Sequence, residues 1–356
     1  MTDLPGGDAP DEDAPLLPER RTRRRRGASA PTAPGPVPPT DPTTAAFQAH
    51  VRSARSELEN QVAHARAEFD QANERIKERT GRDLIVAIGI GLAIGATVVV
   101  SLIFWKWIFV VFALGAAVLG VFEFGRALQG SGRRVDLVPQ VVLGSVLVVS
   151  AWFLQMWLLW VVVFAAVAVT VVWRLVAQMV ARDGRRYGDV LDDALVAGFL
   201  QLYVPFMAAL CVVLLRQERG EFWVLAFLIV VVAADTGAYA TGLMIGRHPM
   251  APRISPKKTW EGFAGAAAAS LIAGVLLAWL LLQLPVWTGL ILGVIILGTA
   301  TVGDLGESMI KRDLGIKDMS SWLPGHGGVL DRLDSILLSA PAALALYYLL
   351  TPLVTR

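Results

Sequence analysis

Long apolar blocks fill the chain from residue 84 onward and decide what it can fold into. Residues 1–83 are polar and charged, whereas most later blocks stay apolar for about the 20 residues that a membrane-spanning helix needs. Hydrophobic residues make up 55% of the 356-residue sequence, compared with roughly 45–50% in soluble domains. We therefore expect an all-α polytopic integral membrane protein with a soluble N-terminal extension.

About nine of these blocks are long enough to cross a bilayer. The first two are separated only by Lys106 and its neighbours, which predicts a tight hairpin. The expected spans are 84–105, 107–128, 136–154, 156–176, 193–215, 221–246, 260–284, 287–306 and 333–351. The chain then divides into a disordered Pro/Arg-rich tail, an amphipathic helix, a first set of transmembrane helices and a C-terminal transmembrane domain, over 1–45, 46–83, 84–215 and 216–356.

The segment before the spans has two parts. Residues 1–45 cannot bury enough apolar surface to order themselves. Their basic run RRTRRRR could contact nucleic acid, but beside a bilayer we favour anionic lipid or control of topology, and expect no nucleic-acid partner. Residues 46–83 place apolar side chains every three or four positions, which predicts a helix on the membrane surface or, alternatively, a short dimeric coiled coil. The single cysteine, Cys211, excludes a disulfide framework.

The distribution of lysine and arginine predicts which ends of the spans face the cytoplasm. With the N-terminus inside, the inner connections hold Arg126, Arg133, Arg134, Arg182, Arg185, Arg186, Arg247, Arg253, Lys257, Lys258, Lys311, Arg312, Lys317 and Arg332. The outer connections hold only Lys106, Arg216 and Arg219, with Arg356 at the end. With nine spans, we expect the N-terminus inside and the C-terminus outside.

Two polar clusters interrupt the spans, both at the predicted cytoplasmic face. The first begins with Asp235 at the end of the sixth span. The second joins the eighth and ninth spans and holds Asp304, Glu307, Asp331 and Asp334. The last two acids are three positions apart and share a helix face. Ionisable residues in such places indicate function, although a single one could be a helix-end charge that reaches water.

Oxygen ligands from two helices suit a hard cation such as Mg²⁺, which usually takes one or two carboxylates together with substrate phosphates. The alternative is an ion network that caps helices, with Arg332 or Lys311 as the partner of the aspartates. The basic side chains near the acids suit phosphate groups, and they are Lys257, Lys258, Lys311, Arg312, Lys317 and His326. We interpret His326 as a phosphate or metal-shell contact and not as the base that activates a nucleophile.

Two short segments add hydrogen-bond donors. The glycines of PGHGG, residues 324–328, can take positive φ and let backbone N–H groups approach an anion. In SPKKT, Pro256 fixes a turn, and Ser255 and Thr259 can cap a helix N-terminus that favours phosphate. The sequence contains no Walker A motif, and no Ser–His–Asp arrangement is evident. Together these residues predict phosphoryl or nucleotidyl transfer by charge neutralisation and positioning.

The stretch SMIKRDLGIKDMSSWLPGHGGVLDRLD, residues 308–334, resembles the signature of the phosphatidate cytidylyltransferase (CDP-diacylglycerol synthase) family. The matching fixed positions are Ser308, Lys311, Arg312, Lys317, Asp318, His326, Gly327, Gly328, Asp331, Arg332 and Asp334. DTGAY, SPKKTWEG and GDLGES also look like motifs of that family. The specific resemblance covers 221–350, and the N-terminal 83 residues lie outside it.

The resemblance implies that CTP and phosphatidic acid react to give CDP-diacylglycerol and pyrophosphate. It implies Asp304 and Asp331 as ligands of Mg²⁺ or Mn²⁺, with K⁺ as a further ion nearby. It makes 216–356 the catalytic domain and suggests a homodimer in the cell membrane. The catalytic residues would be Asp304, Asp331, Asp334, Lys311 and Arg312, and the substrate-binding residues Asp235, Ser255, Lys257, Lys258, Thr259, Lys317, Asp318, His326, Gly327, Gly328 and Arg332.

Two other functions remain open. A CTP-dependent kinase of a polyprenol or dolichol would release CDP and not pyrophosphate, but the complete 308–334 signature argues against it. A transporter would use the acids as a cation or proton relay, but it should place them near the bilayer midplane and not at one interface.

Several other residues are interpreted as structural. Glu123 ends the second span and could pair with Arg126 at i+3. Prolines at three positions are expected to kink or end helices: Pro139, Pro205 and Pro285. Tryptophans at predicted outer ends of spans are expected to anchor the interface: Trp105, Trp107 and Trp287.

Overall fold

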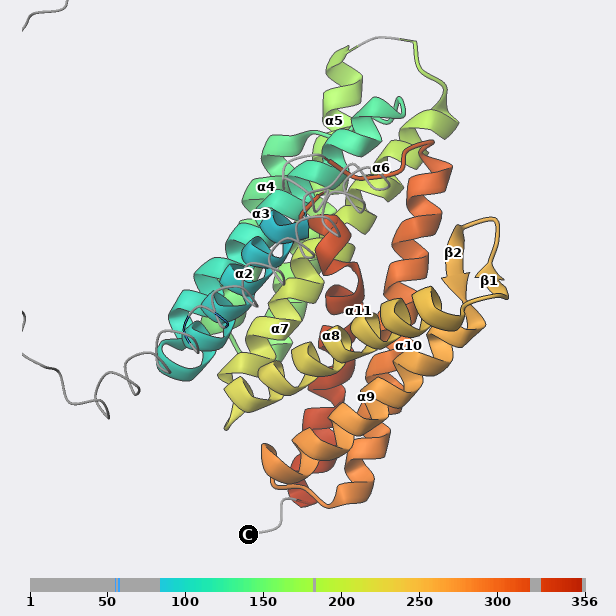
Figure 1. The fold of residues 1–356 in the computed structure, drawn as a ribbon. Helices are drawn as coiled ribbons and strands as arrows, with labels where there is room; N and C mark the ends of the chain where they lie inside the picture. Colours follow the sequence, from blue (N-terminus) through green and yellow to red (C-terminus); the bar gives the residue numbers. More distant parts are fainter. Residues whose placement is uncertain (1–54, 56, 58–83, 182–183, 321–327, 354–356) are drawn as a thin grey trace, which may run out of the picture. The chain divides into compact units, whose positions relative to one another are not determined.

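The computed structural model describes residues 55, 57, 84–181, 184–320 and 328–353. Contacts divide the chain into two compact units, Met1–Glu68 and Phe69–Arg356. The predicted tail over 1–45 lies outside the described residues, and so does the predicted amphipathic helix except for Arg55 and Glu57, which are both helical. All labelled helices of Figure 1 belong to the second unit.

Apolar helices make up the second unit, at the places where the apolar blocks predict spans (Figure 1). They are α2 (Leu84–Phe104), α3 (Lys106–Gly130), α4 (Leu137–Phe153), α5 (Met156–Ala181), α6 (Tyr187–Gln201), α7 (Met207–Arg216), α8 (Gly220–Ile245), α9 (Trp260–Leu280), α10 (Val286–Asp313) and α11 (Leu330–Leu350), followed by the 3₁₀ turn Thr351–Leu353. In the described part of the chain, seven helical segments are long and apolar enough to cross a membrane, and Gly91–Phe104 and Leu137–Phe153 are shorter apolar helices. The predicted all-α polytopic membrane protein is therefore confirmed, with a small β-hairpin added to it.

The outward surfaces of these helices are apolar, as contact with lipid requires. Large hydrophobic side chains such as Phe164 and Val172 are exposed, at 68% and 57% of their surface. The three tryptophans predicted for an interface are also exposed: Trp105 by 55%, Trp107 by 61% and Trp287 by 52%. A folded protein in water would bury many of these groups, so the exposure supports a lipid environment.

α6 and α7 form one helical run, Tyr187–Arg216, although Pro205 lies inside it. Residues Leu202–Phe206 wind as a π-helix, η1, because proline has no N–H to donate and its ring needs room in the preceding turn. The ring packs on α4 at Gly144, where an added Cβ would lie 2.7 Å from the proline Cγ. Pro205 thus changes the winding of the helix without ending it.

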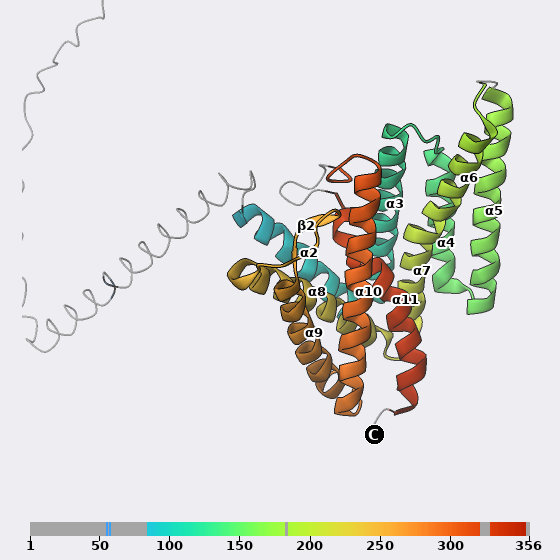
Figure 2. The same cartoon turned by 90° about the vertical axis from the view of Figure 1, so that its right-hand side faces the viewer.

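α8, α9 and α10 pack closely through glycines. A Cβ on Gly237 of α8 would lie 2.6 Å from the carbonyl oxygen of Gly265 of α9. A Cβ on Gly274 of α9 would lie 2.4 Å from the carbonyl oxygen of Gly289 of α10. Small residues let helix backbones approach within a membrane, where the hydrophobic effect does not drive helices together. α11 lies between α10 and α7 and also contacts α8 and α3 (Figures 1 and 2).

A β-hairpin joins α8 to α9. Its antiparallel strands are β1 (Pro249–Ala251) and β2 (Ser255–Thr259), with Ser255 opposite Ala251. The prediction of a turn at SPKKT is therefore wrong: the segment is a strand, and Pro256 is tolerated because each strand of a two-stranded sheet has a free edge. Ser255 pairs in the sheet and does not cap a helix, whereas Thr259 caps α9 as predicted, since its hydroxyl accepts a hydrogen bond from Gly262 N–H at 3.1 Å.

The connections between helices gather at two ends of the second unit. At one end, Lys106 forms an ion pair with Glu221 at 2.5 Å. Two arginines there donate hydrogen bonds to backbone carbonyls: Arg216 to Leu154 at 2.5 Å and Arg219 to Leu281 at 3.0 Å. At the other end, Arg133 donates a hydrogen bond to the Asp192 carboxylate at 2.7 Å. Two further arginines donate to backbone carbonyls at 3.2 Å: Arg185 to Gly132 and Arg312 to Ile254. We call the second group, formed by 131–136, 184–186, 246–259 and 314–320, the basic end. It contains the connections that the sequence predicts to be rich in lysine and arginine.

Candidate active site

The last turn of α10 carries the predicted residues Lys311 and Arg312, and the first turn of α11 carries Asp331 and Arg332. α10 ends in a Schellman motif, in which the Gly315 N–H donates to the Arg312 carbonyl and the Ile316 N–H donates to the Lys311 carbonyl. Gly315 has φ of +71°, a left-handed conformation that favours glycine. The motif satisfies the carbonyls of the basic pair, Lys311 and Arg312, and the helix ends one residue later, at Asp313.

Asp331, in the first turn of α11, accepts hydrogen bonds from three parts of the chain. Lys311 Nζ lies 2.8 Å from Oδ1, and the backbone N–H groups of Met319 and Gly328 donate to Oδ2 at 3.1 and 2.8 Å. The side chain is only 6% exposed. Lys311 is therefore the cation partner of Asp331, as the alternative of an ion network expects, but the backbone donors Met319 and Gly328 precede α11, so this contact does not cap the helix.

Asp304 of α10 pairs with Lys258 of strand β2, and both side chains are partly exposed, by 32% and 25%. Arg312 also holds the hairpin against α10, because its Nε donates to the Ile254 carbonyl at 3.2 Å and its Nη1 to the Ile316 carbonyl at 3.3 Å. The β-hairpin therefore places a lysine beside Asp304. The sequence predicts that Arg312 offsets substrate charge. In the structure it donates to the Ile254 and Ile316 carbonyls and so holds the hairpin beside α10.

Glu307 and Asp334 are the buried acids of the cluster, at 0% and 8% exposure. α10 and α11 approach closely here, because a Cβ on Gly303 would lie 2.3 Å from the Asp334 carbonyl oxygen. Glu307 lies 3.5 Å from Lys311 Nζ, and neither of its carboxylate oxygens has a hydrogen-bond partner among the described residues. Two buried carboxyls side by side are costly unless a cation or a proton compensates them.

Two further groups reach the same place from other helices. Asp235 of α8 interacts electrostatically with Asp304 and Asp334. Tyr203 of the π-helix interacts with Glu307 and Asp334, and its hydroxyl, buried in the second unit, has no hydrogen-bond partner in the described part of the chain. Five acids from α8, α10 and α11 thus form one group, which we call the acidic cluster: Asp235, Asp304, Glu307, Asp331 and Asp334.

The other predicted residues lie around this cluster. Four are exposed at the basic end, where solutes can reach them: Lys257, Lys317, Asp318 and Arg332. Gly328 is close to two carboxylates, since an added Cβ would lie 2.8 Å from Glu123 Oε2 and 3.1 Å from Asp331 Oδ2. His326 and Gly327 lie outside the described residues.

Comparison with known proteins decides the family. The sequence model of the cytidylyltransferase family matches residues 85–350. The chain belongs to this family. It is 39% identical over 280 residues to the phosphatidate cytidylyltransferases of Mycobacterium bovis and Mycobacterium leprae, covering 74% and 76% of this chain and 88% and 90% of those proteins. A Synechocystis phosphatidate cytidylyltransferase is 48% identical over 126 residues, 35% of this chain and 42% of that protein. The predicted family is confirmed.

The acidic cluster of this cytidylyltransferase-family chain fits a divalent cation by its chemistry. Carboxylates are the ligands that Mg²⁺ and Mn²⁺ prefer, and the buried Glu307 oxygens lack a donor. The expected ligands, Asp304 and Asp331, each contact a lysine, Lys258 and Lys311. Within the described ranges, no group of three or more His, Cys, Asp or Glu already has the arrangement of a metal site. A metal on these two aspartates would therefore replace lysine contacts.

Sequence reasoning misjudged Glu123, and it named Glu307 in the second polar cluster without giving it a role in the site. The predicted pair of Glu123 with Arg126 is wrong: the Glu123 carboxylate accepts hydrogen bonds from Ser320, Val329 and Leu330, and Arg126 lies over the Phe122 ring at 5.4 Å. No local signal could reveal partners about 200 positions away. A role for Glu307 could have been inferred, because it lies one helical turn from Asp304 and from Lys311.

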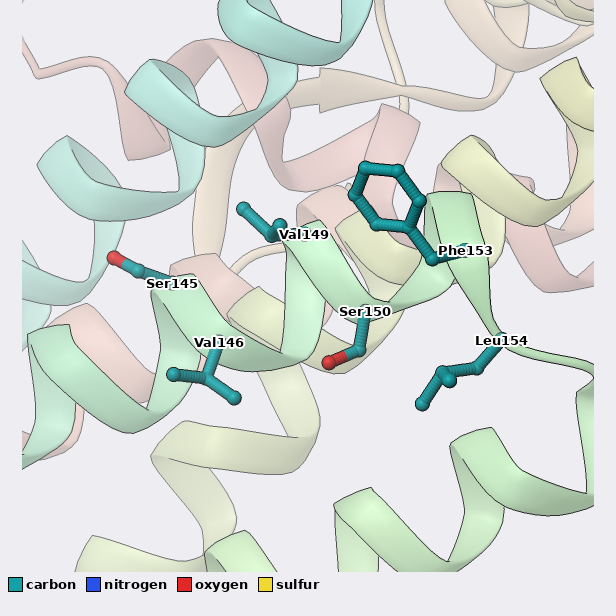
Figure 3. Close-up of a pocket in the computed structure, with 6 residues that line it drawn as sticks. All are labelled: Ser145, Val146, Val149, Ser150, Phe153 and Leu154. Carbon is teal, nitrogen blue, oxygen red and sulfur yellow. The ribbon is translucent and has the colours of Figure 1, made fainter.

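A pocket on α4 is a different feature from the acidic cluster (Figure 3). It has a volume of about 460 Å³ and is lined by Ser145, Val146, Val149, Ser150, Phe153 and Leu154. It contains no charged side chain that could hold a phosphate, and Ser145 already donates to the Val141 carbonyl at 2.7 Å. The six lining residues therefore offer a phosphate no cationic partner.

Proposed function

We propose that this protein is a phosphatidate cytidylyltransferase, which converts CTP and phosphatidic acid into CDP-diacylglycerol and pyrophosphate. The carrying observation is that Lys258 and Lys311 contact carboxylates of the acidic cluster where apolar helices end. Such a place can receive a water-soluble nucleotide and a lipid headgroup together. Membership of the cytidylyltransferase family and the names of its relatives support CTP as the donor.

The reaction joins an oxygen of the lipid phosphate to the α-phosphorus of CTP. The bond from that phosphorus to the oxygen that bridges to the β-phosphate breaks, and pyrophosphate leaves with the electron pair. A phosphate monoester is largely ionised at neutral pH, since its second pKa is about 6, so no general base is required. The main task of the protein is to bring two anions together and hold them in line.

Basic side chains perform this task. Lys258 and Lys311 neutralise charge on the reacting phosphates when they exchange their carboxylate partners for substrate oxygens. Lys257 and Lys317, which are exposed, bind the phosphates that become pyrophosphate. Arg312 keeps the hairpin in place, so that Lys258 stays beside α10. The remaining predicted substrate contacts are kept as the family resemblance implies: Asp235, Ser255, Thr259, Asp318, His326, Gly327, Gly328 and Arg332.

Asp304 and Asp331 would hold Mg²⁺ or Mn²⁺, which supplies charge neutralisation and polarises phosphate oxygens. Glu307 and Asp334 add negative charge behind these ligands, and we assign K⁺ to the same region. Because Glu307 is fully buried, it stabilises cations in its surroundings without contacting the solvent.

We also propose how the protein sits in the cell membrane. All nine predicted spans cross, the N-terminus is cytoplasmic, and the basic end with its acidic cluster faces the cytoplasm, in agreement with the lysine and arginine distribution. The acyl chains of phosphatidic acid stay in the bilayer while the headgroup reaches the ends of α10 and α11. We propose a homodimer as the assembled state.

The test uses the purified full-length protein in detergent with phosphatidic acid, labelled CTP and Mg²⁺. The wild type should form lipid-bound cytidine and pyrophosphate in equal amounts. Asp304→Asn should lose this activity while Asp189→Asn should keep it. Asp189 is an exposed acid in the first turn of α6, so it controls for the loss of one negative charge at the same end of the protein.

Other products would contradict the proposal. Release of CDP together with a phosphorylated lipid would identify a kinase. If folded protein gives neither product while an established cytidylyltransferase is active in the same assay, the proposed reaction is wrong.

A further inference from the structure

Glu123 links α3 to the start of α11 through both of its carboxylate oxygens. Ser320 Oγ donates to Oε1 at 2.6 Å, the Val329 N–H donates to Oε1 at 3.0 Å, and the Leu330 N–H donates to Oε2 at 2.9 Å. Glu123 is only 2% exposed. A buried carboxylate with three donors is a fully satisfied group, so its geometry is firmly set.

The two backbone donors belong to the N-terminus of α11. The first N–H groups of a helix have no partner within the helix, and the helix dipole favours a negative charge at this place. In most helices a nearby side chain accepts hydrogen bonds from these N–H groups. In α11 the acceptor is Glu123, which lies 207 positions before Leu330. Glu123 therefore fixes where α11 begins relative to α3.

Gly328 shows how tightly the arrangement is built. A Cβ there would lie 2.8 Å from Glu123 Oε2 and 3.1 Å from Asp331 Oδ2, so a glycine is needed for both carboxylates to approach. Asp331 in turn accepts hydrogen bonds from Gly328 and Met319. Glu123 and Asp331 together therefore bond Met319 and Ser320 as well as residues 328–330.

We infer that Glu123 is a positioning residue for the cytidylyl-transfer site, acting through the start of α11 on Asp331 and Asp334. The inference rests on the proposed function, and it gives the N-terminal helices a part in the chemistry beyond that of a membrane scaffold. Glu123 need not touch a substrate for this, because Asp331 follows Leu330 directly and Asp334 lies one turn further along the same helix.

The main variant is Glu123→Gln, which keeps size and shape. Its carbonyl oxygen can still accept from Ser320 and Val329, but its amide group meets the Leu330 N–H, so that two donors face each other. An unsatisfied buried donor is expected to lower kcat/KM for CTP by about tenfold to a hundredfold. Glu123→Asp, which shortens the side chain by one methylene, should lose activity as well, and Ser320→Ala should lose less.

The matched control is Glu221→Gln. This acid also makes a contact between helices, with Lys106 at 2.5 Å, but it lies at the opposite end of the second unit. It should keep wild-type kcat and KM even if it lowers the unfolding temperature. Thermal unfolding and size-exclusion profiles of all variants show how much of each sample is folded, and kcat is expressed per folded protein.

A second readout does not depend on catalysis. Amide hydrogen exchange at Val329 and Leu330 should be faster in Glu123→Gln than in the wild type and in Glu221→Gln. Wild-type exchange at these amides together with wild-type kcat and KM in Glu123→Gln would overturn the inference. If the wild type itself shows no cytidylyl transfer, the proposed function fails, and the exchange measurement still decides whether Glu123 positions α11.

Discussion

Replacing Gly303 by alanine should push α10 away from α11 and lower activity without removing any charged group. An alanine Cβ at this position would lie 2.3 Å from the carbonyl oxygen of Asp334 and 3.1 Å from its carbonyl carbon. Because Cβ contacts under 3.0 Å essentially never occur, the two backbones must separate by at least about 0.7 Å. Both partners are helix backbone, so no side chain can rotate to make room.

The separation acts directly on the acidic cluster. Asp304 and Glu307 follow Gly303 on α10, whereas Asp334 belongs to α11. A misplacement of about 1 Å can cost about a hundredfold in rate, and overpacking of this kind costs about 1–3 kcal/mol of stability. We therefore expect kcat/KM for CTP to fall by about tenfold to a hundredfold, together with a lower unfolding temperature.

Gly298→Ala is the matched control for this experiment. Gly298 lies on the same helix, but an added Cβ meets nothing within 4 Å. This variant should keep wild-type kinetics and gain about 0.5–1 kcal/mol of stability, because alanine favours the helix more than glycine does. Both variants are measured as full-length protein in detergent, by initial rates and thermal unfolding. Wild-type kcat/KM in Gly303→Ala, or equal losses in the two variants, would refute the reasoning.

Four other perturbations test other parts of the protein. Asp193→Asn should lower the free energy of unfolding by about 3–5 kcal/mol, because Asp193 is fully buried and pairs with Arg185 at 2.5 Å. A loss below about 1 kcal/mol in denaturant titrations would contradict this expectation. Asp192→Asn breaks only a partly exposed ion pair and should cost less than about 1 kcal/mol in the same titrations. Lys258→Met should lower kcat/KM for CTP by about tenfold to a hundredfold, because it removes the cation beside Asp304, and unchanged initial rates would exclude Lys258 from the site. Removal of divalent ions with EDTA should abolish transfer and added Mg²⁺ or Mn²⁺ should restore it, whereas full activity in EDTA would exclude a required metal.

The positions of the helices could be predicted from the sequence because each is a long apolar block with polar connections. The helical run through Pro205 could be predicted as a span, but its π-helical turn could not, since the turn depends on the room that Gly144 leaves on α4. The SPKKT strand escaped prediction for a related reason. A five-residue strand paired with only three residues has little pattern of its own, and a contact with α10, between Lys258 and Asp304, holds it.

The candidate site could be predicted where its contacts are local or join neighbouring helices. Lys311 and Asp331 are 20 positions apart and lie on consecutive spans, so the signature brings them together. Glu123 is a different case, because a lone acid in an apolar span points most simply to a neighbour such as Arg126. Its true partners depend on how α3 packs against α11, and no pattern within α3 encodes that packing.

The hydrogen bond between Glu123 and Leu330 also bears on how the enzyme is assembled during its synthesis. A membrane protein is inserted as it is synthesised, so α3, α8 and α10 enter the bilayer before α11 exists. The acids of α10 therefore cannot contact α11 until it has been synthesised. The same holds for Glu123, because 207 positions separate it from Leu330. Closing so long a loop costs only slightly more entropy than closing a shorter one. However, the loop between Glu123 and Leu330 cannot close until α11 has been synthesised. The growing chain therefore has no working site, and catalysis begins only when α11 joins the helices that preceded it.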